Sequence, residues 1–225
     1  MSSPVAVSES GRTRVKGGRE RREKRNTQDR SVRRNVVLCT PSISSSTEMQ
    51  EYIAQQVSSI KKRWVYEILS GDSEKENVLL STPEFIFLPD TEALNDGHVI
   101  NWLAIFRDPS LKSIRSLTGV HLPVLKDCRD RCLAYVMQNT NFDACDVMAY
   151  FHYLPSVFQL HVHFCAPYGK YTTHDVCKIH TLGNVISNLE IDALYYQKVS
   201  LTTVVLGKGD LSSVYRAHRK DTVKL

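Results

Sequence analysis

The stretch HYLPSVFQLHVHF, residues 152–164, decides the fold because it joins a Pro-Ser turn to an apolar run that alternates with polar side chains. In an extended strand, successive side chains point to opposite faces of a sheet. The apolar residues of the run predict its buried face: Leu160, Val162 and Phe164. The polar residues share the other face, toward solvent or a polar pocket: Gln159, His161 and His163.

A third histidine can join this polar face. His152 precedes the Pro155-Ser156 turn, so a hairpin would bring it beside His161 and His163. Three converging imidazoles can bind a transition metal, although an HxH pair needs a third ligand and orienting carboxylates. They can also hold phosphate oxygens while one of them attacks phosphorus. Because exposed strand histidines with neither role are also common, the spacing alone leaves these three interpretations open.

The remaining patterns predict an α+β fold with an antiparallel sheet and packed helices. Apolar residues from Ile53 to Ile68 recur at three- and four-residue steps, which predicts a helix that ends at Ser70-Gly71. Two short strands are expected at residues 77–81 and 85–88. The other expected helices are residues 99–106, 121–138 and about 174–189, and the other expected strands are residues 147–153, 158–166 and 201–206.

The basic character of the chain belongs to one end. The net charge is +5, but residues 1–35 hold 11 Lys and Arg against 4 Asp and Glu, a balance of +7. We therefore expect residues 1–47 to be a basic, Ser/Thr-rich disordered tail and residues 48–225 to form the folded domain. The run from Arg19 to Arg25 fits either a nuclear-import or RNA-contacting segment or a solvated tail with no specific partner.

The sequence gives little support for a membrane protein or a secreted, disulfide-linked protein. No apolar run approaches the roughly 20 residues needed to cross a bilayer, and the first residues lack the apolar centre of a secretory signal. The six cysteines show no disulfide-framework spacing. These features favour a cytoplasmic or nuclear protein with reduced cysteines.

The run at residues 152–164 closely resembles the signature of the scavenger mRNA-decapping branch of the histidine-triad (HIT) hydrolases, in which the strand reads HxHxH. Four further stretches resemble the same family: RWVYEIL at residues 63–69, FLPD at 87–90, SIRSL…HLPVLKD at 113–127 and NVISNLEIDALYYQKVSLT at 184–202. The resemblance extends over about residues 59–207 and implies a HIT-like domain that hydrolyses the 5′ cap of capped dinucleotides and short capped RNA left by 3′-to-5′ mRNA decay.

The resemblance implies a role for each matching residue. His161 would be the nucleophile and form a nucleotidyl-histidine, without a metal or other cofactor. Histidines 152 and 163 would hold the phosphates, with Ser156, Gln159 and Lys178 close by. Residues of the cap pocket would be Trp64, which stacks on 7-methylguanine, Glu74, which accepts from the guanine edge, and Asp90. The resemblance also implies a homodimer.

Several positions depart from the family pattern. Gln159 replaces the first histidine of the triad, Val157 a tyrosine, and Lys178 an arginine, while Thr91-Glu92 replaces an apolar residue and a lysine. The folded N-terminal domain of the family is matched here by a short or truncated, largely disordered region. The alternative is therefore a catalytically weakened or inactive cap-binding paralogue. A HIT-type hydrolase of dinucleoside polyphosphates is a third possibility, and a metal-dependent HxH enzyme is a fourth.

Overall fold

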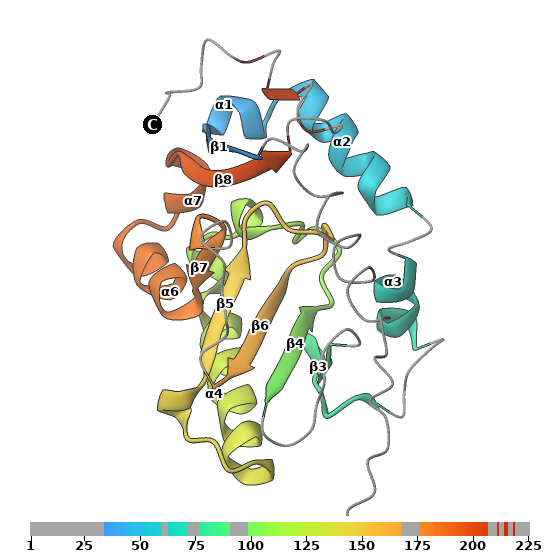
Figure 1. Cartoon of the computed structure of the whole chain (residues 1–225), viewed down its shortest axis with the longest axis vertical. Coiled ribbons are helices and arrows are strands. Elements are labelled where there is room, and N and C mark those ends of the chain that lie inside the picture. The colour runs from blue at the N-terminus through green and yellow to red at the C-terminus, as the bar shows by residue number, and fades with distance from the viewer. Residues whose placement is uncertain are drawn as a thin grey trace, which may run out of the picture. The chain divides into compact units, whose positions relative to one another are not determined.

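The computed structural model describes residues 34–59, 63–71, 77–90, 99–167 and 176–206, together with residues 211, 214, 215 and 218. All of them belong to the compact unit 34–225, and the unit 1–33 lies outside the described residues. The elements follow in chain order: β1 (Arg34–Cys39), α1 (Pro41–Ser44), α2 (Thr47–Ser58), α3 (Arg63–Ser70), β2 (Leu80–Ser81), β3 (Phe85–Pro89), β4 (Ile100–Phe106), η3 (Ile114–Ser116), η4 (Gly119–His121), α4 (Leu122–Asn139), η5 (Ala144–Asp146), β5 (Met148–His152), β6 (His161–Ala166), β7 (Ile179–Thr181), α6 (Leu182–Ile191), α7 (Tyr195–Lys198) and β8 (Leu201–Leu206) (Figure 1).

An antiparallel sheet of six strands forms the centre of this unit, in the order β2-β3-β4-β6-β5-β7. The register pairs His163 of β6 with Leu103 of β4 on one side and with Tyr150 of β5 on the other. Strands β1 and β8 form a separate two-stranded sheet. The predicted α+β class with an antiparallel sheet and packed helices is therefore confirmed.

One face of the six-stranded sheet, which we call the core face, packs against α4 and α6. Residues that pair directly in neighbouring strands share a face, so the register assigns this face its buried side chains: Phe85, Phe87, Ile100, Trp102, Ala104, Phe106, Phe151, Val162, Phe164 and Ala166. Helix α4 presents buried residues at helical spacing: Leu125, Cys128, Cys132 and Val136. Burying one such large side chain contributes about 1.5–3 kcal/mol, so this face supplies most of the stabilising apolar contact.

The opposite face, the site face, is covered only in part. Helix α3 places Val65 and Ile68 in a second, smaller apolar cluster with residues of β3 and β4. The sheet contributes four buried residues to that cluster: Ile86, Leu88, Leu103 and Ile105. The remaining part of this face, on β6 and β5, carries the histidines.

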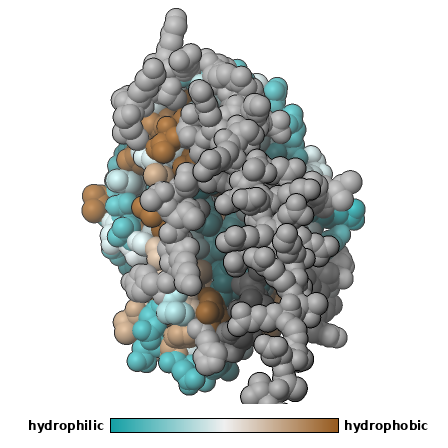
Figure 2. Space-filling view, viewed as in Figure 1, coloured by the Kyte–Doolittle hydropathy of each residue, from teal (hydrophilic) through white to brown (hydrophobic). Residues whose placement is uncertain are grey.

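Hydrophobic side chains reach the surface only in places. The space-filling view shows separate brown patches among hydrophilic residues (Figure 2). Val120 and Ile191 are the most exposed large apolar residues, each 80% accessible. Among the described residues, no helix is long and apolar enough to span a membrane.

Three predicted helices need correction. In place of the helix expected at residues 99–106, Ile100–Phe106 form strand β4, because INWLAIF lies between β3 and β6 and is buried almost throughout. The helix expected from Ile53 to Ser70 is interrupted, since Ser59 caps α2 in an extended conformation and α3 begins at Arg63. Of the helix expected over about residues 174–189, residues 174 and 175 lie outside the described residues, residues 179–181 form edge strand β7, and helix α6 covers Leu182–Ile191.

The predicted boundary between tail and domain, at residue 47, also moves. Residues 34–39 form β1, which pairs along its whole length with β8. Arg115 ties this sheet to the rest of the unit, since its guanidinium donates to the carbonyl oxygens of Cys39 and Tyr196, each at 2.6 Å. Residues 34–47 therefore belong to the folded unit. The rest of the predicted tail, residues 1–33, lies outside the described residues.

Candidate active site

Three histidine rings converge on the site face, as the predicted hairpin requires. His161 and His163 lie on the same side of β6, with ring centroids 5.1 Å apart. His152, at the end of β5, brings its ring to 4.7 Å from that of His163. The antiparallel pairing of β5 with β6 positions all three, because it places Tyr150 opposite His163 and His152 beyond it.

The proton on His161 is placed by a backbone carbonyl. Its Nδ1 lies 2.7 Å from the carbonyl oxygen of Gln159, which can only accept, so Nδ1 carries the hydrogen. Burial lowers the pKa of His161, and this effect is opposed by the Gln159 hydrogen bond and the Asp90 charge. The ring is therefore neutral near pH 7, and its Nε2 has a free lone pair. A neutral imidazole with its Nε2 lone pair free is the state needed in a nucleophile.

His163 is partly buried, and one of its nitrogens is itself buried. Its Nε2 has no hydrogen-bond partner among the described residues. Burial, and then the neighbouring His161 and His152, keep the pKa of His163 well below its usual value. A buried polar nitrogen without a partner is costly in a folded protein. This nitrogen therefore has unused hydrogen-bonding capacity, and an anion close to it would favour protonation of the ring.

Tyr150 supports His163 from the adjacent strand. The two rings are stacked at 5.0 Å with an interplanar angle of 10°. The Cys165 thiol donates to Asn101 Oδ1 at 3.0 Å, so the Tyr150 hydroxyl, 3.7 Å from the sulfur, acts as donor to it. Asn101 Nδ2 in turn donates to Asp90 Oδ2 at 3.2 Å. A continuous polar chain thus runs from Asp90 through Asn101 and Cys165 to Tyr150, whose ring stacks on that of His163.

The structure gives Gln159 a task other than the direct ligand contact that the resemblance implied. It precedes β6, and its side chain is completely buried. Its Nε2 donates to the carbonyl oxygens of Phe106 and Asp108 at 2.7 and 2.9 Å, which ties the turn to the end of β4. We therefore interpret Gln159 as a support for the nucleophile: its backbone orients His161, and its amide fixes the backbone.

The other predicted residues lie at varying distances along the chain from the triad. Trp64 is partly buried on α3, at the margin of the smaller apolar cluster, which is compatible with packing and with one accessible ring face. Ser156 is exposed in the turn between β5 and β6. Lys178 is partly buried next to β7, and its carbonyl accepts from the Tyr153 amide at 2.8 Å. Glu74 and the Thr91-Glu92 pair lie outside the described residues.

Three residues of this site were not identified from the sequence: Tyr150, Asn101 and Cys165. The alternation of β5 offered a signal for Tyr150, since it lies two residues before His152 and so on the same face. Asn101 could not be found while residues 99–106 were taken for a helix. Cys165 lies two residues beyond His163, on the same face by the same rule.

Metal binding has no additional support in the geometry. Among residues 34–59, 63–71, 77–90, 99–167, 176–206 and the four isolated positions, no group of three His, Cys, Asp or Glu side chains is arranged to hold an ion. The arrangement is suited to phosphate chemistry instead, because it combines one oriented, neutral imidazole with two further imidazoles that can accept protons.

Comparisons with known proteins identify chains of similar sequence. The family described as scavenger mRNA decapping enzyme C-term binding matches residues 63–175. An m7GpppX diphosphatase of Homo sapiens is 33% identical over 152 residues, which cover 64% of this chain and 44% of the human protein. One of Ascaris suum is 32% identical over 187 residues, 80% of this chain and 60% of that protein. The chain thus spans about half the length of the curated relatives it matches.

Solved structures show a more distant likeness. A crystal structure of the aprataxin ortholog Hnt3 in complex with DNA aligns with 72% of this chain and 94% of its own, with a TM-score of 0.39 and 15% sequence identity. A likeness at this level carries no argument about function. The sequence relatives and the geometry of the triad are the two observations that bear on the chemistry of this chain.

Proposed function

The chain belongs to the family of scavenger mRNA decapping enzymes, and from this premise we propose that it hydrolyses the 5′ cap of capped dinucleotides and short capped RNA. The products are 7-methylguanosine monophosphate and a nucleoside diphosphate. The observation that carries the proposal is the convergence of three imidazoles around His161, whose Nδ1 is held by a backbone carbonyl at 2.7 Å.

The reaction proceeds in two displacements. His161 Nε2 attacks the phosphorus next to 7-methylguanosine, a nitrogen–phosphorus bond forms, and the nucleoside diphosphate leaves with the electron pair of the broken P–O bond. Water then attacks the same phosphorus, which releases 7-methylguanosine monophosphate and returns the electron pair to Nε2. His163 and His152 stabilise the phosphate oxygens, and the approach of an anion favours protonation of His163. We propose that this route needs no metal ion or other cofactor.

The cap pocket is inferred from the family match. Trp64 offers a ring face to the positively charged 7-methylguanine base, and such stacking is worth about 1–3 kcal/mol per base. Glu74 would accept hydrogen bonds from the guanine edge, and Asp90 completes the pocket from the end of β3. If Trp64 serves this purpose, Trp64→Ala weakens cap binding by that amount. An unchanged dissociation constant would show that Trp64 only packs against the second apolar cluster.

The second candidate is a cap-binding protein with weak or no turnover. It is favoured by Gln159, whose buried amide supplies no positive charge where the family carries a histidine. Lys178 points the same way, because a lysine cannot hold a phosphate with the two parallel hydrogen bonds of an arginine. Both candidates use the same pocket, and they differ only in the rate of the covalent step.

The test is incubation of the purified chain with radiolabelled 7-methyl-GpppG, with and without EDTA, followed by chromatography of the products. Release of 7-methyl-GMP that survives EDTA is the expected result. Intact substrate with bound cap, detected by tryptophan quenching, would establish the second candidate. Equal hydrolysis of unmethylated GpppG would instead indicate a hydrolase of dinucleoside polyphosphates.

Assembly and location are part of the proposal. We propose a homodimer, as the family resemblance implies, and light scattering coupled to size exclusion measures it directly. A monomeric mass at working concentration would refute the dimer without affecting the hydrolysis assay. We also propose a cytoplasmic or nuclear location, which imaging of the tagged full chain tests.

A further inference from the structure

A second pocket lies outside the histidine site, beside the turn that joins α1 to α2. Its volume is about 430 Å³, within the range of small-molecule sites. We call it the α1–α2 pocket, and the residues that line it are Pro41, Ser44, Ser45, Met49, Gln50, Ile53, Ser110, Lys112, Ser113, Arg115, Ser116, Tyr153, Leu154, Phe158 and Gln197.

Charge is distributed unevenly around this pocket. Among the described residues that line it, Lys112 and Arg115 are cationic and none is acidic. The partners that the structure gives the Arg115 guanidinium are neutral oxygens, namely the carbonyls of Cys39, Tyr196 and Val199 and the hydroxyl of Tyr153. Among the described residues, the hydrogen-bond partners of its positive charge are therefore dipoles and not anions. That charge extends to its neighbours, since it helps to lower the pKa of His180.

Lys112 is partly balanced by a nearby acid. Its charge contributes to lowering the pKa of Asp108, for which the hydrogen bonds from Ser110 are the largest cause. Asp108 does not line the pocket, and its carboxylate accepts from the Ser110 amide at 2.8 Å. The pocket itself therefore retains an excess of positive charge, which favours an anionic occupant.

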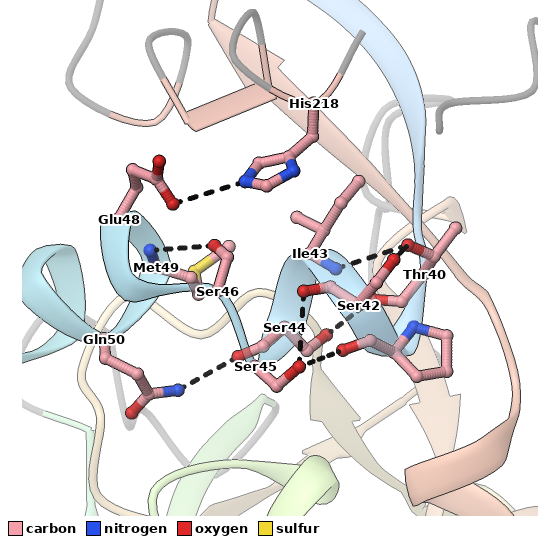
Figure 3. A network of polar contacts seen from close by, with 11 residues as sticks. Thr40, Ser42, Ile43, Ser44, Ser45, Ser46, Glu48, Met49, Gln50 and His218 are labelled. Atoms are coloured by element: carbon pink, nitrogen blue, oxygen red, sulfur yellow. Dashed lines mark hydrogen bonds and ion pairs between the residues drawn. The ribbon is translucent and has the colours of Figure 1, made fainter. Parts of the chain in front are cut away.

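Hydroxyl and amide groups form the rim on the α1–α2 side. Figure 3 shows Ser44, Ser45 and Gln50 around the turn between the two helices. Gln50 Nε2 donates to the Ser44 carbonyl at 3.0 Å, and Ser45 Oγ donates to the Pro41 carbonyl at 3.1 Å. Each of these groups has further hydrogen-bonding capacity, because a hydroxyl oxygen also accepts and an amide nitrogen carries a second hydrogen. The rim can therefore bind sugar hydroxyls as well as phosphate oxygens.

The remaining wall is apolar. Met49 and Ile53 come from α2, and Leu154 and Phe158 come from the segment between β5 and β6. Phe158 is fixed by an edge contact with Tyr52, with ring centroids 5.9 Å apart. A wall of this kind accommodates the ring of a base or the carbon face of a sugar. The pocket thus joins three chemistries: cationic side chains, a polar rim and an apolar surface.

The pocket adjoins the triad along the chain but belongs to a different part of the sheet. Tyr153 lines the pocket and directly follows His152 in the chain. Because successive side chains of a strand alternate, Tyr153 points to the core face, and it packs in the main apolar cluster there. The histidines lie on the site face. The turn between β5 and β6 therefore separates two sites and contributes residues to both.

We propose that the α1–α2 pocket is a second binding site, which takes a nucleoside monophosphate. The phosphate lies toward Lys112 and Arg115, the ribose hydroxyls contact the serine and glutamine rim, and the base covers the apolar wall. This site is independent of cap hydrolysis at the triad. A ligand there would connect α2, the 110–116 segment and the turn that carries Ser156, so it would also stabilise the folded unit.

The experiment titrates the full chain with three probes: uridine 5′-monophosphate, uridine and inorganic phosphate. Amide shifts in two-dimensional NMR show where each probe binds. We expect the monophosphate to shift Gln50, Ser116 and Leu154, with uridine and phosphate each binding about tenfold or more weakly. Shifts confined to His161 and His163, or none at all, would overturn the proposal. Equal affinity for inorganic phosphate and the monophosphate would reject a nucleotide as the ligand.

Variants test the electrostatic part. Lys112→Glu and Gln50→Glu each place a negative charge at the pocket, and we expect the monophosphate to bind about tenfold more weakly. Gln55→Glu adds the same charge to an exposed position on the same helix, outside the lining residues. It should change the dissociation constant less than about twofold. An equal loss in the Gln55 and Gln50 variants would refute a local site. Arg115 is left intact, because it holds three backbone carbonyls.

Discussion

The two faces of the six-stranded sheet use the same strands for opposite purposes. On the core face, Val162 and Phe164 are completely buried among the side chains of α4 and the neighbouring strands. On the site face, His161 and His163 alternate with them along β6 and are only partly buried. The first face is closely packed, although Trp102 Nε1 and His180 Nε2 are buried there without a partner among the described residues. The second leaves His163 Nε2 without a partner among the described residues.

Because of this difference, residues that determine stability alternate along β6 with residues that determine the chemistry. Close packing makes the core face intolerant of lost volume, since a cavity removes both transfer energy and contacts. The unpaired nitrogen on the site face costs folding free energy, and it leaves hydrogen-bonding capacity unused. Neighbouring residues of one strand should therefore give mutants of two distinct kinds.

The largest effect is expected on the site face. His161→Asn removes the nucleophile, so hydrolysis of 7-methyl-GpppG should fall by several orders of magnitude. Because the one hydrogen bond of the ring to a described residue is that to Gln159, and the ring is not part of the apolar clusters, the thermal midpoint should change little. Product formation by chromatography and thermal unfolding measure the two quantities. A variant that unfolds would contradict the separation of the two faces.

Phe164→Ala tests the other face, next to His163. Its ring packs edge-on against Phe87 at 5.2 Å and is completely buried. Its loss should lower the free energy of unfolding by about 3–5 kcal/mol. Urea unfolding gives this value. At a temperature where the variant remains folded, its activity should persist, and loss of activity in a fully folded variant would argue against two independent faces.

The pH dependence of the free energy of unfolding gives a further test. Burial, assisted by the Arg115 charge, lowers the pKa of His180 on β7 to about 4. Below the unfolded value of about 6.5 the unfolded chain binds the extra proton, so stability is lost as the pH falls from 6.5 to 4. The loss from this one group approaches about 3 kcal/mol at pH 4.

His180→Phe should remove that part of the acid sensitivity. Urea unfolding at pH 7.5 and at pH 4.5 supplies the comparison, because only the difference between the two pH values matters and any packing change cancels. An acid sensitivity equal to that of the unchanged chain would show that His180 is already protonated in the folded state.

The smallest effect is expected for Tyr150, which supports His163. Tyr150→Leu removes the stacked ring and should reduce kcat about tenfold, with a smaller change in KM. Tyr150→Phe retains the ring and removes the hydroxyl that contacts Cys165, so its kcat should remain within about threefold of the original. If the two variants behave alike, the hydroxyl rather than the stacked ring positions His163.

Some of this could be predicted from the sequence, for identifiable reasons. Helix α4 was found because its buried residues recur at helical spacing over its whole length, and strand β8 because LTTVVL is a short run rich in β-branched residues. The run INWLAIF was taken for a helix, since a strand buried on both faces has no alternation to reveal it. The convergence of His152, His161 and His163 follows from the turn and period two. The place of Gln159 does not, because the strand begins only at His161.

The antiparallel pairing of β1 with β8 has a consequence for synthesis on the ribosome. Arg34 pairs with Leu206, so the backbone groups of β1 gain their hydrogen-bond partners only after β8 has been synthesised. Until then, β1 presents an open edge on which another chain could add a strand. The loop to be closed spans the whole six-stranded sheet, and such non-local contacts form late. We therefore expect the central sheet to form first, around β6. The β1–β8 sheet should form only after translation has passed Leu206.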